Sequence, residues 1–331
     1  MKDTGLLRNI YVNMMKQYIL YLVFDSTKIQ NEFVYSLLSL DKVISQGLRD
    51  EIEIIVYTNI EFQVPPIVAH FKITFRVLDK SEYETWLKRS NNFFLTLKAW
   101  ILKDFFSHYR TNALFVDTDT FFVKDPLPLF QSIEQGHLQM HVREEKFLQK
   151  TEICNYLKTH RFNSLDGTSY AISTQAYMWN SGVVGVNYSN WPIVDEIINL
   201  IEQISNDNEW PKKPTWDSKL IEQLAFSYFF QRNNKIRAAE QYIIHYWFFK
   251  PFRLFIGKNI GYFNGSDEIE FSNFIKKDQV QRTDVTQLEF KDVSSVLFTI
   301  MNEYSYIYLE LLFNLPAKTF IGELLREEIF G

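Results

Sequence analysis

The stretch Ala113-Leu-Phe-Val-Asp-Thr-Asp-Thr-Phe-Phe-Val-Lys-Asp-Pro126 carries the most structural information in this chain. Four apolar residues, 113–116, lead directly into two aspartates that are two residues apart, Asp117 and Asp119. A compact apolar run that ends at turn-forming residues is typical of a buried strand in a parallel sheet. Because ligands bind at the carboxyl ends of such strands, we expect both carboxylates at a ligand-binding edge.

An Asp-x-Asp pair is weak evidence alone, since most such pairs are solvated turns. Here the strand would deliver both carboxylates to a partly buried edge, where unpaired anions cost free energy. A hard divalent cation with oxygen ligands removes that cost, and it also binds phosphate oxygens. The stretch therefore favours a metal and diphosphate site.

Apolar runs typical of strands alternate with segments of helical periodicity on both sides of this stretch. This alternation predicts an α/β fold with a mainly parallel, right-handed central sheet flanked by helices. Strands are expected at 18–24, 52–57, 73–77, 113–116, 183–186 and 242–246, and helices at 33–44, 94–105, 193–204 and 217–230.

Three parts are expected along the chain: an N-terminal arm (1–15), the α/β domain (16–255) and a mostly helical C-terminal extension (256–331). Long apolar periodicity in the extension suits a packed cap, a homodimer surface or a membrane-docking element, with packing favoured. The polar segment 144–168 is expected to be mobile or to face an acceptor.

The composition narrows the function classes. Of the 331 residues, 46% are hydrophobic and 23% are charged, which is typical of a globular protein. The formal net charge of −5 gives no support to nucleic-acid binding, so a diphosphate would be neutralised locally. A single cysteine, Cys154, excludes an intrachain disulfide and a multi-cysteine zinc site, and it suits a reducing compartment.

The 30 Phe, 18 Tyr and 7 Trp predict an aromatic core, with a minority of rings lining a ligand cleft. The apolar run 18–24 is too short to span a bilayer. The sequence contains no stretch of about 18 uninterrupted apolar residues, the length that a membrane-spanning helix needs. We expect a soluble cytoplasmic protein, with peripheral contact at the inner membrane face left open.

The stretch 113–126 resembles the metal-binding segment of retaining GT-A glycosyltransferases, in particular the glycogenin and lipopolysaccharide galactosyltransferase family. Three more segments are similar to motifs of that family and follow in the same order. They are 179–187 (Trp-Asn-Ser-Gly-Val-Val-Gly-Val-Asn), 222–227 (Glu-Gln-Leu-Ala-Phe-Ser) and 245–251 (His-Tyr-Trp-Phe-Phe-Lys-Pro). The resemblance covers about residues 16–252 and implies a GT-A, Rossmann-like fold.

The resemblance implies that Asp117, Asp119 and His245 bind Mn²⁺ or Mg²⁺. Thr118, between the aspartates, belongs to the implied donor site. Lys250 would lie near the diphosphate and offset its charge as the leaving group departs. The competing interpretation of His245 is a structural histidine, which is the commoner role of a lone His on a strand. For Lys250 it is a surface lysine.

The nucleoside and ribose are implied to lie at the ends of the first two strands. Plain turn caps explain some of these residues equally well. The candidates there are Phe24, Asp25, Ser26, Tyr57 and Thr58. Lys98, on a helix ahead of the Asp-x-Asp strand, would face the donor, and the alternative is a solvated helical lysine.

The implied catalytic group consists of Asn180, Glu222 and Gln223, with Ser181 and Gly182 beside the donor sugar. In the family, the glutamine has been discussed as the β-face group in retention. Glu222 stands where the family has aspartate, and it would stabilise charge or act as nucleophile. The structural alternative for Glu222 is an ordinary partner of the helix dipole, and for Gly182 it is a β-bulge.

The resemblance thus implies transfer of a hexose from a nucleoside-diphosphate sugar, by default a UDP-sugar, with retention. The acceptor would be a hydroxyl of a glycan, a lipid-linked saccharide or a protein. Two other classes stay open. A catalytically silent GT-A scaffold would serve binding alone, and a sugar nucleotidyltransferase is disfavoured because no glycine-rich loop follows the first strand.

Overall fold

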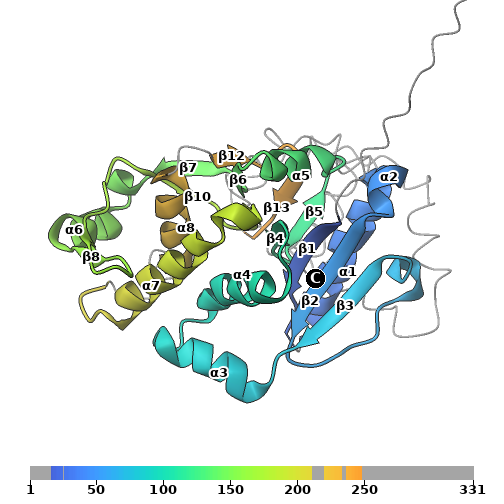
Figure 1. Cartoon of the computed structure of the whole chain (residues 1–331), viewed down its shortest axis with the longest axis horizontal. Helices are drawn as coiled ribbons and strands as arrows, with labels where there is room; N and C mark the ends of the chain where they lie inside the picture. Colours follow the sequence, from blue (N-terminus) through green and yellow to red (C-terminus); the bar gives the residue numbers. More distant parts are fainter. Residues whose placement is uncertain (1–15, 25, 211–219, 233–235, 248–331) are drawn as a thin grey trace, which may run out of the picture.

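A computed structural model describes residues 16–24, 26–210, 220–232 and 236–247 (Figure 1). The arm, the C-terminal extension, Asp25 and Lys250 lie outside these residues. The centre of the described fold is a seven-stranded sheet of order β12-β6-β11-β4-β1-β2-β3. Four of the six strand pairings are parallel, and the two antiparallel ones both involve β11. The predicted α/β class, with a mainly parallel sheet flanked by helices, is confirmed.

The large sheet and three small two-stranded sheets account for the strands. The large sheet contains β1 (Gln17–Leu22), β2 (Ile52–Thr58), β3 (Lys72–Val77), β4 (Ala113–Val116), β6 (Leu138–Met140), β11 (Val183–Val186) and β12 (Ile236–Ala238). The small sheets pair β5 (Thr120–Phe122) with β13 (Ile243–His245), β7 (Arg143–Lys146) with β10 (Tyr177–Trp179), and β8 (Phe162–Asn163) with β9 (Ser169–Tyr170).

Helices connect these strands. They are α1 (Thr27–Val43), α2 (Gln46–Arg49), α3 (Lys80–Arg89), α4 (Leu97–His108), α5 (Leu127–Glu134), α6 (Thr151–Thr159), α7 (Pro192–Asn206) and α8 (Ile221–Arg232). Short 3-10 turns lie at Pro66–Val68, Phe94–Thr96, Phe147–Gln149 and Tyr188–Asn190. Among the described residues, none of the helices has both the length and the apolar character needed to cross a bilayer.

Strand β1 is apolar on both faces because each face is covered by helices. Side chains alternate along a strand, so Ile19 and Tyr21 point into the core that includes α1. Tyr18 and Leu20 point the other way, into the core formed with α4, α7 and α8. The two cores enclose the sheet, which explains the uninterrupted apolar run in the sequence.

The antiparallel strand β11 positions the site. In its pairing with β4, Val183 lies opposite Val116. The residues that precede β11 therefore meet those that follow β4, and the Asp117 N–H donates to the Gly182 carbonyl at 2.9 Å. The small β5–β13 pair adds His245, which lies opposite Thr120. Three segments distant in the sequence thus meet at one sheet edge.

Two expectations need correction. The strand expected at 242–246 exists as β13, but it pairs with β5 outside the large sheet. The segment 144–168, expected to be mobile or to face an acceptor, contains strand β7 and helix α6, which argues against the first alternative, and the second stays a prediction. Ile153 and Leu157 of α6 are buried in the core with α7 and α8, which holds this segment in place.

The packing of α4 gives a test of the fold. Phe105 is fully buried and contacts the rings of Tyr18 and Tyr109. Phe105→Ala should lower the free energy of unfolding by about 3–5 kcal/mol, through lost burial and a cavity. The matched control Phe94→Ala, whose ring is 44% exposed, should cost about 1 kcal/mol or less. Urea unfolding followed by circular dichroism measures both, and equal losses would contradict this packing.

Candidate active site

Backbone hydrogen bonds fix the turn that carries the two aspartates. The Thr120 hydroxyl donates to the Asp117 carbonyl at 2.7 Å, and the Tyr246 N–H donates to the Asp119 carbonyl at 3.0 Å. Together with the bond from the Asp117 N–H to Gly182, these contacts tie the turn to β11 and to β13. The carboxylates are therefore held by the sheet edge and not by a free loop.

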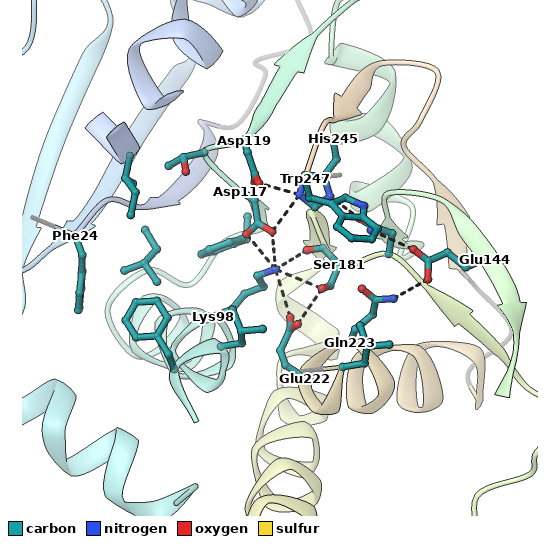
Figure 2. A pocket seen from close by; sticks show the side chains of 18 of the residues that line it. Phe24, Lys98, Asp117, Asp119, Glu144, Ser181, Glu222, Gln223, His245 and Trp247 are labelled. Atoms are coloured by element: carbon teal, nitrogen blue, oxygen red, sulfur yellow. Dashed lines mark hydrogen bonds and ion pairs between the residues drawn. The ribbon is translucent and has the colours of Figure 1, made fainter. Parts of the chain in front are cut away.

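Asp117, Asp119 and His245 form a cluster whose candidate ligand atoms all lie within 4.8 Å of one another. His245 Nε2 is 3.1 Å from Asp119 Oδ1 and 3.9 Å from Asp117 Oδ2 (Figure 2). The Asp117 side chain keeps 27% of its surface exposed, so the cluster opens toward a cavity. The structure thus brings the three predicted metal ligands together.

The hydrogen bonds of Asn180 place a hydrogen on Nδ1 of His245. Asn180 Oδ1 accepts the Gly182 N–H at 3.0 Å, so the atom that contacts His245 Nδ1 at 2.7 Å is an acceptor. Nδ1 must then carry the hydrogen. In the neutral ring, Nε2 has a lone pair directed at the Asp119 carboxylate. A divalent cation held between them would replace this repulsion by coordination, and two carboxylates with an oriented imidazole could hold such a cation.

A second histidine packs against this ring without adding charge. His141, which the sequence reasoning missed, meets the His245 ring edge-on with centroids 5.7 Å apart. Its Nε2 lies 3.1 Å from the Ile243 carbonyl, to which it donates. Burial, together with the neighbouring His245, lowers the pKa of His141 to about 3. It is therefore a neutral support for the His245 ring.

Gly182 is required by the same close packing. A Cβ at this position would lie 2.1 Å from His245 Nδ1, far inside any contact distance. The ring is fixed on one side by this backbone and on the other by Asp119. The absence of a side chain at 182 therefore serves His245.

Lys98 is buried between two carboxylates and is not the solvated lysine of the alternative interpretation. Its Nζ lies 3.0 Å from Asp117 Oδ1 and 3.4 Å from Glu222 Oε1, and it donates to the Ser181 carbonyl at 2.7 Å. Burial alone would lower the pKa of Lys98, but Asp117 and Glu222 outweigh it and raise that pKa above its ordinary value. Lys98 is therefore a permanent cation beside the metal cluster.

Glu222, at the start of α8, is more deeply buried than any other acid of the site, with 2% of its surface exposed. The Ser181 hydroxyl donates to its Oε2 at 2.9 Å. Burial raises the pKa of Glu222, and Lys98 opposes this effect. Both carboxylate oxygens of Glu222 thus face groups of the protein.

Glu144 of β7 is a site residue that the sequence reasoning missed. Its Oε1 accepts from Asn180 Nδ2 at 3.2 Å, and its Oε2 accepts from Gln223 Nε2 at 2.9 Å. It belongs to the run Arg143-Glu-Glu-Lys146, which matches no motif. Glu144 and Lys146 face inward in the structure, but nothing in this polar run signals that alternation in the sequence.

These residues line a cavity of about 640 Å³. The ring of Phe24 lines it on the side away from Asp117, Asp119 and His245 (Figure 2) and makes edge contacts with Tyr83 and Phe94. The apolar lining residues are Leu22, Phe24, Ile29, Phe94, Leu95, Phe115, Leu220 and Trp247. The polar lining residues are Lys98, Asp117, Thr118, Asp119, Glu144, Glu145, Lys150, Asn180, Ser181, Glu222, Gln223 and His245.

Four predicted donor-site residues do not line this cavity, and one of them is Gly182, which packs against His245. Tyr57 is buried and donates its hydroxyl hydrogen to Asp104 at 3.0 Å, and the Thr58 hydroxyl donates to the Ile60 carbonyl at 2.7 Å. Ser26 caps the start of α1. Strand β2 is separated from β4 by β1, so the end of β2 lies one strand too far from the aspartates.

Comparisons with known proteins find distant structural likeness only. No family model matches the chain, and no curated protein matches it. Three similar solved structures are core-mannan synthase A from Aspergillus fumigatus in its Mn/GDP form (9% identity, TM-score 0.43, 70% of this chain and 75% of that one), galactosyltransferase LgtC with donor and acceptor sugar analogs (13%, 0.41, 67% and 73%), and mouse xyloside xylosyltransferase 1 in its apo form (11%, 0.43, 68% and 85%). All three are glycosyltransferases by name, the enzyme class that the ordered motifs predicted.

The buried lysine can be tested by its effect on stability. Lys98→Met should lower the free energy of unfolding by about 3 kcal/mol or more, because it leaves Glu222 buried without its cation. Lys103→Met is the matched control on the same helix. The Lys103 side chain is 42% exposed and pairs with Asp195. Its replacement should therefore lower the free energy of unfolding by less than about 1 kcal/mol. Urea unfolding that gives similar losses for both variants would contradict the buried network.

The fit of His245 against Gly182 can be tested by metal binding. Gly182→Ala should weaken Mn²⁺ binding at least about tenfold, because the added Cβ displaces the imidazole. Gly47→Ala is the control, since a Cβ there meets nothing within 4 Å. Titration followed by electron paramagnetic resonance measures free Mn²⁺. Wild-type affinity in Gly182→Ala would show that His245 is not a ligand.

Proposed function

We propose that this protein is a metal-dependent glycosyltransferase that moves a hexose from a nucleoside-diphosphate sugar to an acceptor hydroxyl. The observation that carries the proposal is the Asp117–Asp119–His245 cluster in a cavity that also has apolar lining, with Phe24 on the side away from the cluster (Figure 2). A nucleoside diphosphate has the matching division, with a flat base at one end and anionic oxygens at the other.

The two ends of the cavity suit the two parts of such a donor. Phe24 and Phe94 offer aromatic surface for a base, and aromatic faces favour stacking. The diphosphate would lie over the aspartates and the histidine, within reach of a shared cation. Uridine as the base, and Mn²⁺ or Mg²⁺ as the cation, follow from the family resemblance of the ordered motifs.

The chemistry asked of the site is departure of a diphosphate from the anomeric carbon. A bound divalent cation supplies Lewis-acid stabilisation of the charge that develops on the leaving group. Asp117, Asp119 and His245 would hold that cation. Lys98, held between Asp117 and Glu222, supplies a fixed positive charge beside the cluster, which favours anion binding without reorganisation.

Glu222 and Gln223 divide their roles in this proposal. Hydrogen bonds and an ion pair engage both oxygens of Glu222, so it serves as the partner of Lys98 and not as a nucleophile. The Gln223 amide is left as the group that faces the reacting sugar. An amide oxygen on the face opposite the leaving group would stabilise an electron-poor anomeric carbon, which suits a retaining reaction.

The acceptor that we propose is a hydroxyl of a glycan, a lipid-linked saccharide or a protein. Glu145 and Lys150 line the cavity on the side of β7 and α6, and they form an ion pair at 2.8 Å. Each charge of this pair is matched by the other, so neither residue is given a role in the reaction, and the acceptor classes follow from the family resemblance of the motifs. A cytoplasmic location, with contact at the inner membrane face, is part of the same proposal.

Calorimetric titration of UDP, with Mn²⁺ and with a chelator, tests the donor site. Wild type should bind UDP only with metal. Asp119→Ala should lose at least about tenfold in affinity, because a ligand to the cation is gone. Glu145→Gln, which removes a charge from the same cavity and leaves the cluster intact, should keep its affinity within about threefold.

The opposite result is equally clear. Folded wild-type protein that binds neither UDP nor any other nucleoside diphosphate, with or without Mn²⁺, would contradict a glycosyltransferase. It would favour the alternative of a silent scaffold that uses the same fold for binding alone.

A further inference from the structure

Glu144 occupies a position that the proposed function does not yet explain. Its carboxylate lies between two side-chain amides of the cavity, those of Asn180 and Gln223 (Figure 2). We propose that Glu144 is a positioning residue that fixes the Gln223 amide with its oxygen toward the reacting sugar. This inference rests on the proposed function, because it assigns the group that orients the sugar-facing amide.

The chemistry of the carboxylate sets the direction of both amides. An ionised carboxylate accepts hydrogen bonds and donates none. Each oxygen of Glu144 receives one amide N–H₂ group, at 3.2 Å from Asn180 and 2.9 Å from Gln223. Both amide oxygens must therefore point away from Glu144.

Asn180 would keep its orientation without Glu144. Its Oδ1 accepts from the Gly182 N–H and from His245 Nδ1, so a rotated amide would place N–H groups against two donors. Loss of two buried hydrogen bonds makes that rotation costly. The orientation of the Asn180 amide is thus fixed by Gly182 and His245 as well as by Glu144.

Gln223 has no such second determinant. Among the described residues, Glu144 is the one hydrogen-bond partner of its side-chain amide. Figure 2 shows the amide nitrogen directed at Glu144 and the oxygen on the side away from it. Gln223 is 8% exposed and lines the cavity, so this oxygen faces the cavity because Glu144 holds the nitrogen.

The orientation decides the sign of the electrostatic effect. The oxygen is the negative end of the amide dipole, and it favours positive charge that develops on an anomeric carbon. A rotation by half a turn would present N–H₂ instead, which opposes that charge. Glu144 would therefore act on the reaction through Gln223, without touching the sugar's anomeric carbon itself.

The variant Glu144→Gln tests this with almost no change of volume. Its new amide oxygen can accept from one neighbour only, and its new N–H₂ faces the other. Because Asn180 is fixed by Gly182 and His245, Gln223 should rotate and turn its own N–H₂ into the cavity. Glu145→Gln is the matched control, since Glu145 is the adjacent residue, lines the same cavity and pairs instead with Lys150.

The first readout is hydrogen exchange of the Gln223 side-chain amide, followed by nuclear magnetic resonance. In wild type and in Glu145→Gln, the carboxylate bond should protect these hydrogens. In Glu144→Gln they should exchange at least about tenfold faster, because they face the open cavity. Equal exchange in the two variants would overturn the proposal, whatever the protein's substrate is.

The second readout is release of UDP from UDP-glucose and UDP-galactose with Mn²⁺. Glu144→Gln should lower kcat at least about tenfold with KM within about threefold, since the lost interaction belongs to the transition state. A purely structural role would change both constants together, and kcat equal to that of Glu145→Gln would overturn the proposal.

An exchange of the two side chains gives a rescue. In Glu144→Gln with Gln223→Glu, the carboxylate at 223 accepts from the new amide and keeps its other oxygen toward the cavity. This double variant should exceed both single variants in kcat, a non-additivity expected only of directly coupled residues. A double variant as slow as the product of the single losses would contradict the pairing.

Binding of UDP with Mn²⁺ separates this proposal from the proposed function. If wild type and Glu144→Gln both bind UDP within about threefold of each other, the donor site is intact and the kinetic arm judges Glu144 alone. If wild type binds neither UDP nor any other nucleoside diphosphate, the proposed function fails. The exchange arm then still shows whether Glu144 sets the Gln223 amide.

Discussion

Charge balance in the cavity is the constraint on which the site depends. Four carboxylates, those of Asp117, Asp119, Glu144 and Glu222, converge on a partly buried space. Apart from Lys150, which pairs with Glu145, the described lining offers them one lysine, Lys98. Uncompensated anions in such a place cost several kcal/mol each, on the order of the whole stability of a domain. The arrangement is stable only if other groups share the charge.

The negative charge of each carboxylate is compensated by different groups. Glu222 and both oxygens of Asp117 use Lys98, and Glu144 uses two amide N–H₂ groups. Asp119 Oδ1 lies 3.1 Å from His245 Nε2, in the group of candidate ligand atoms that these two residues form with Asp117. This gathering of carboxylate and imidazole atoms is the physical reason for proposing a divalent cation here.

The topology makes this balance geometrically accessible. Strand β11 runs antiparallel between β4 and β6, so its start carries Asn180, Ser181 and Gly182 to the turn that follows β4. A parallel strand in this place would bring its carboxyl end instead. One inserted strand thus supplies an acceptor for the histidine, a carbonyl for the lysine and the gap that the imidazole fills.

The sequence was sufficient for the parts of the site that obey a local rule. The Asp-x-Asp pair could be placed because an apolar strand of fixed direction precedes it, and α7 because Pro192 opens a clear apolar stripe. Tyr57 and Thr58 were wrongly expected at the donor site, because a local sequence pattern does not reveal the order of the strands in a sheet. Glu144 was missed because its partners are 36 and 79 residues away, and nothing in a short polar strand marks them.

The donor-facing role of Lys98 and the catalytic roles of Glu222 and Gln223 stay predictions. The structure defines where these three side chains lie in the cavity. Asp25 and Lys250 lie outside the described residues, so the same reasoning does not extend to them.

Crystals grown with Mn²⁺, with diffraction measured at wavelengths above and below the manganese absorption edge, would test the central claim most directly. The account predicts an anomalous peak among Asp117, Asp119 and His245, with the histidine bound through Nε2. A manganese peak elsewhere, or an ordered Asp117–Asp119–His245 cluster without one at saturating Mn²⁺, would contradict it.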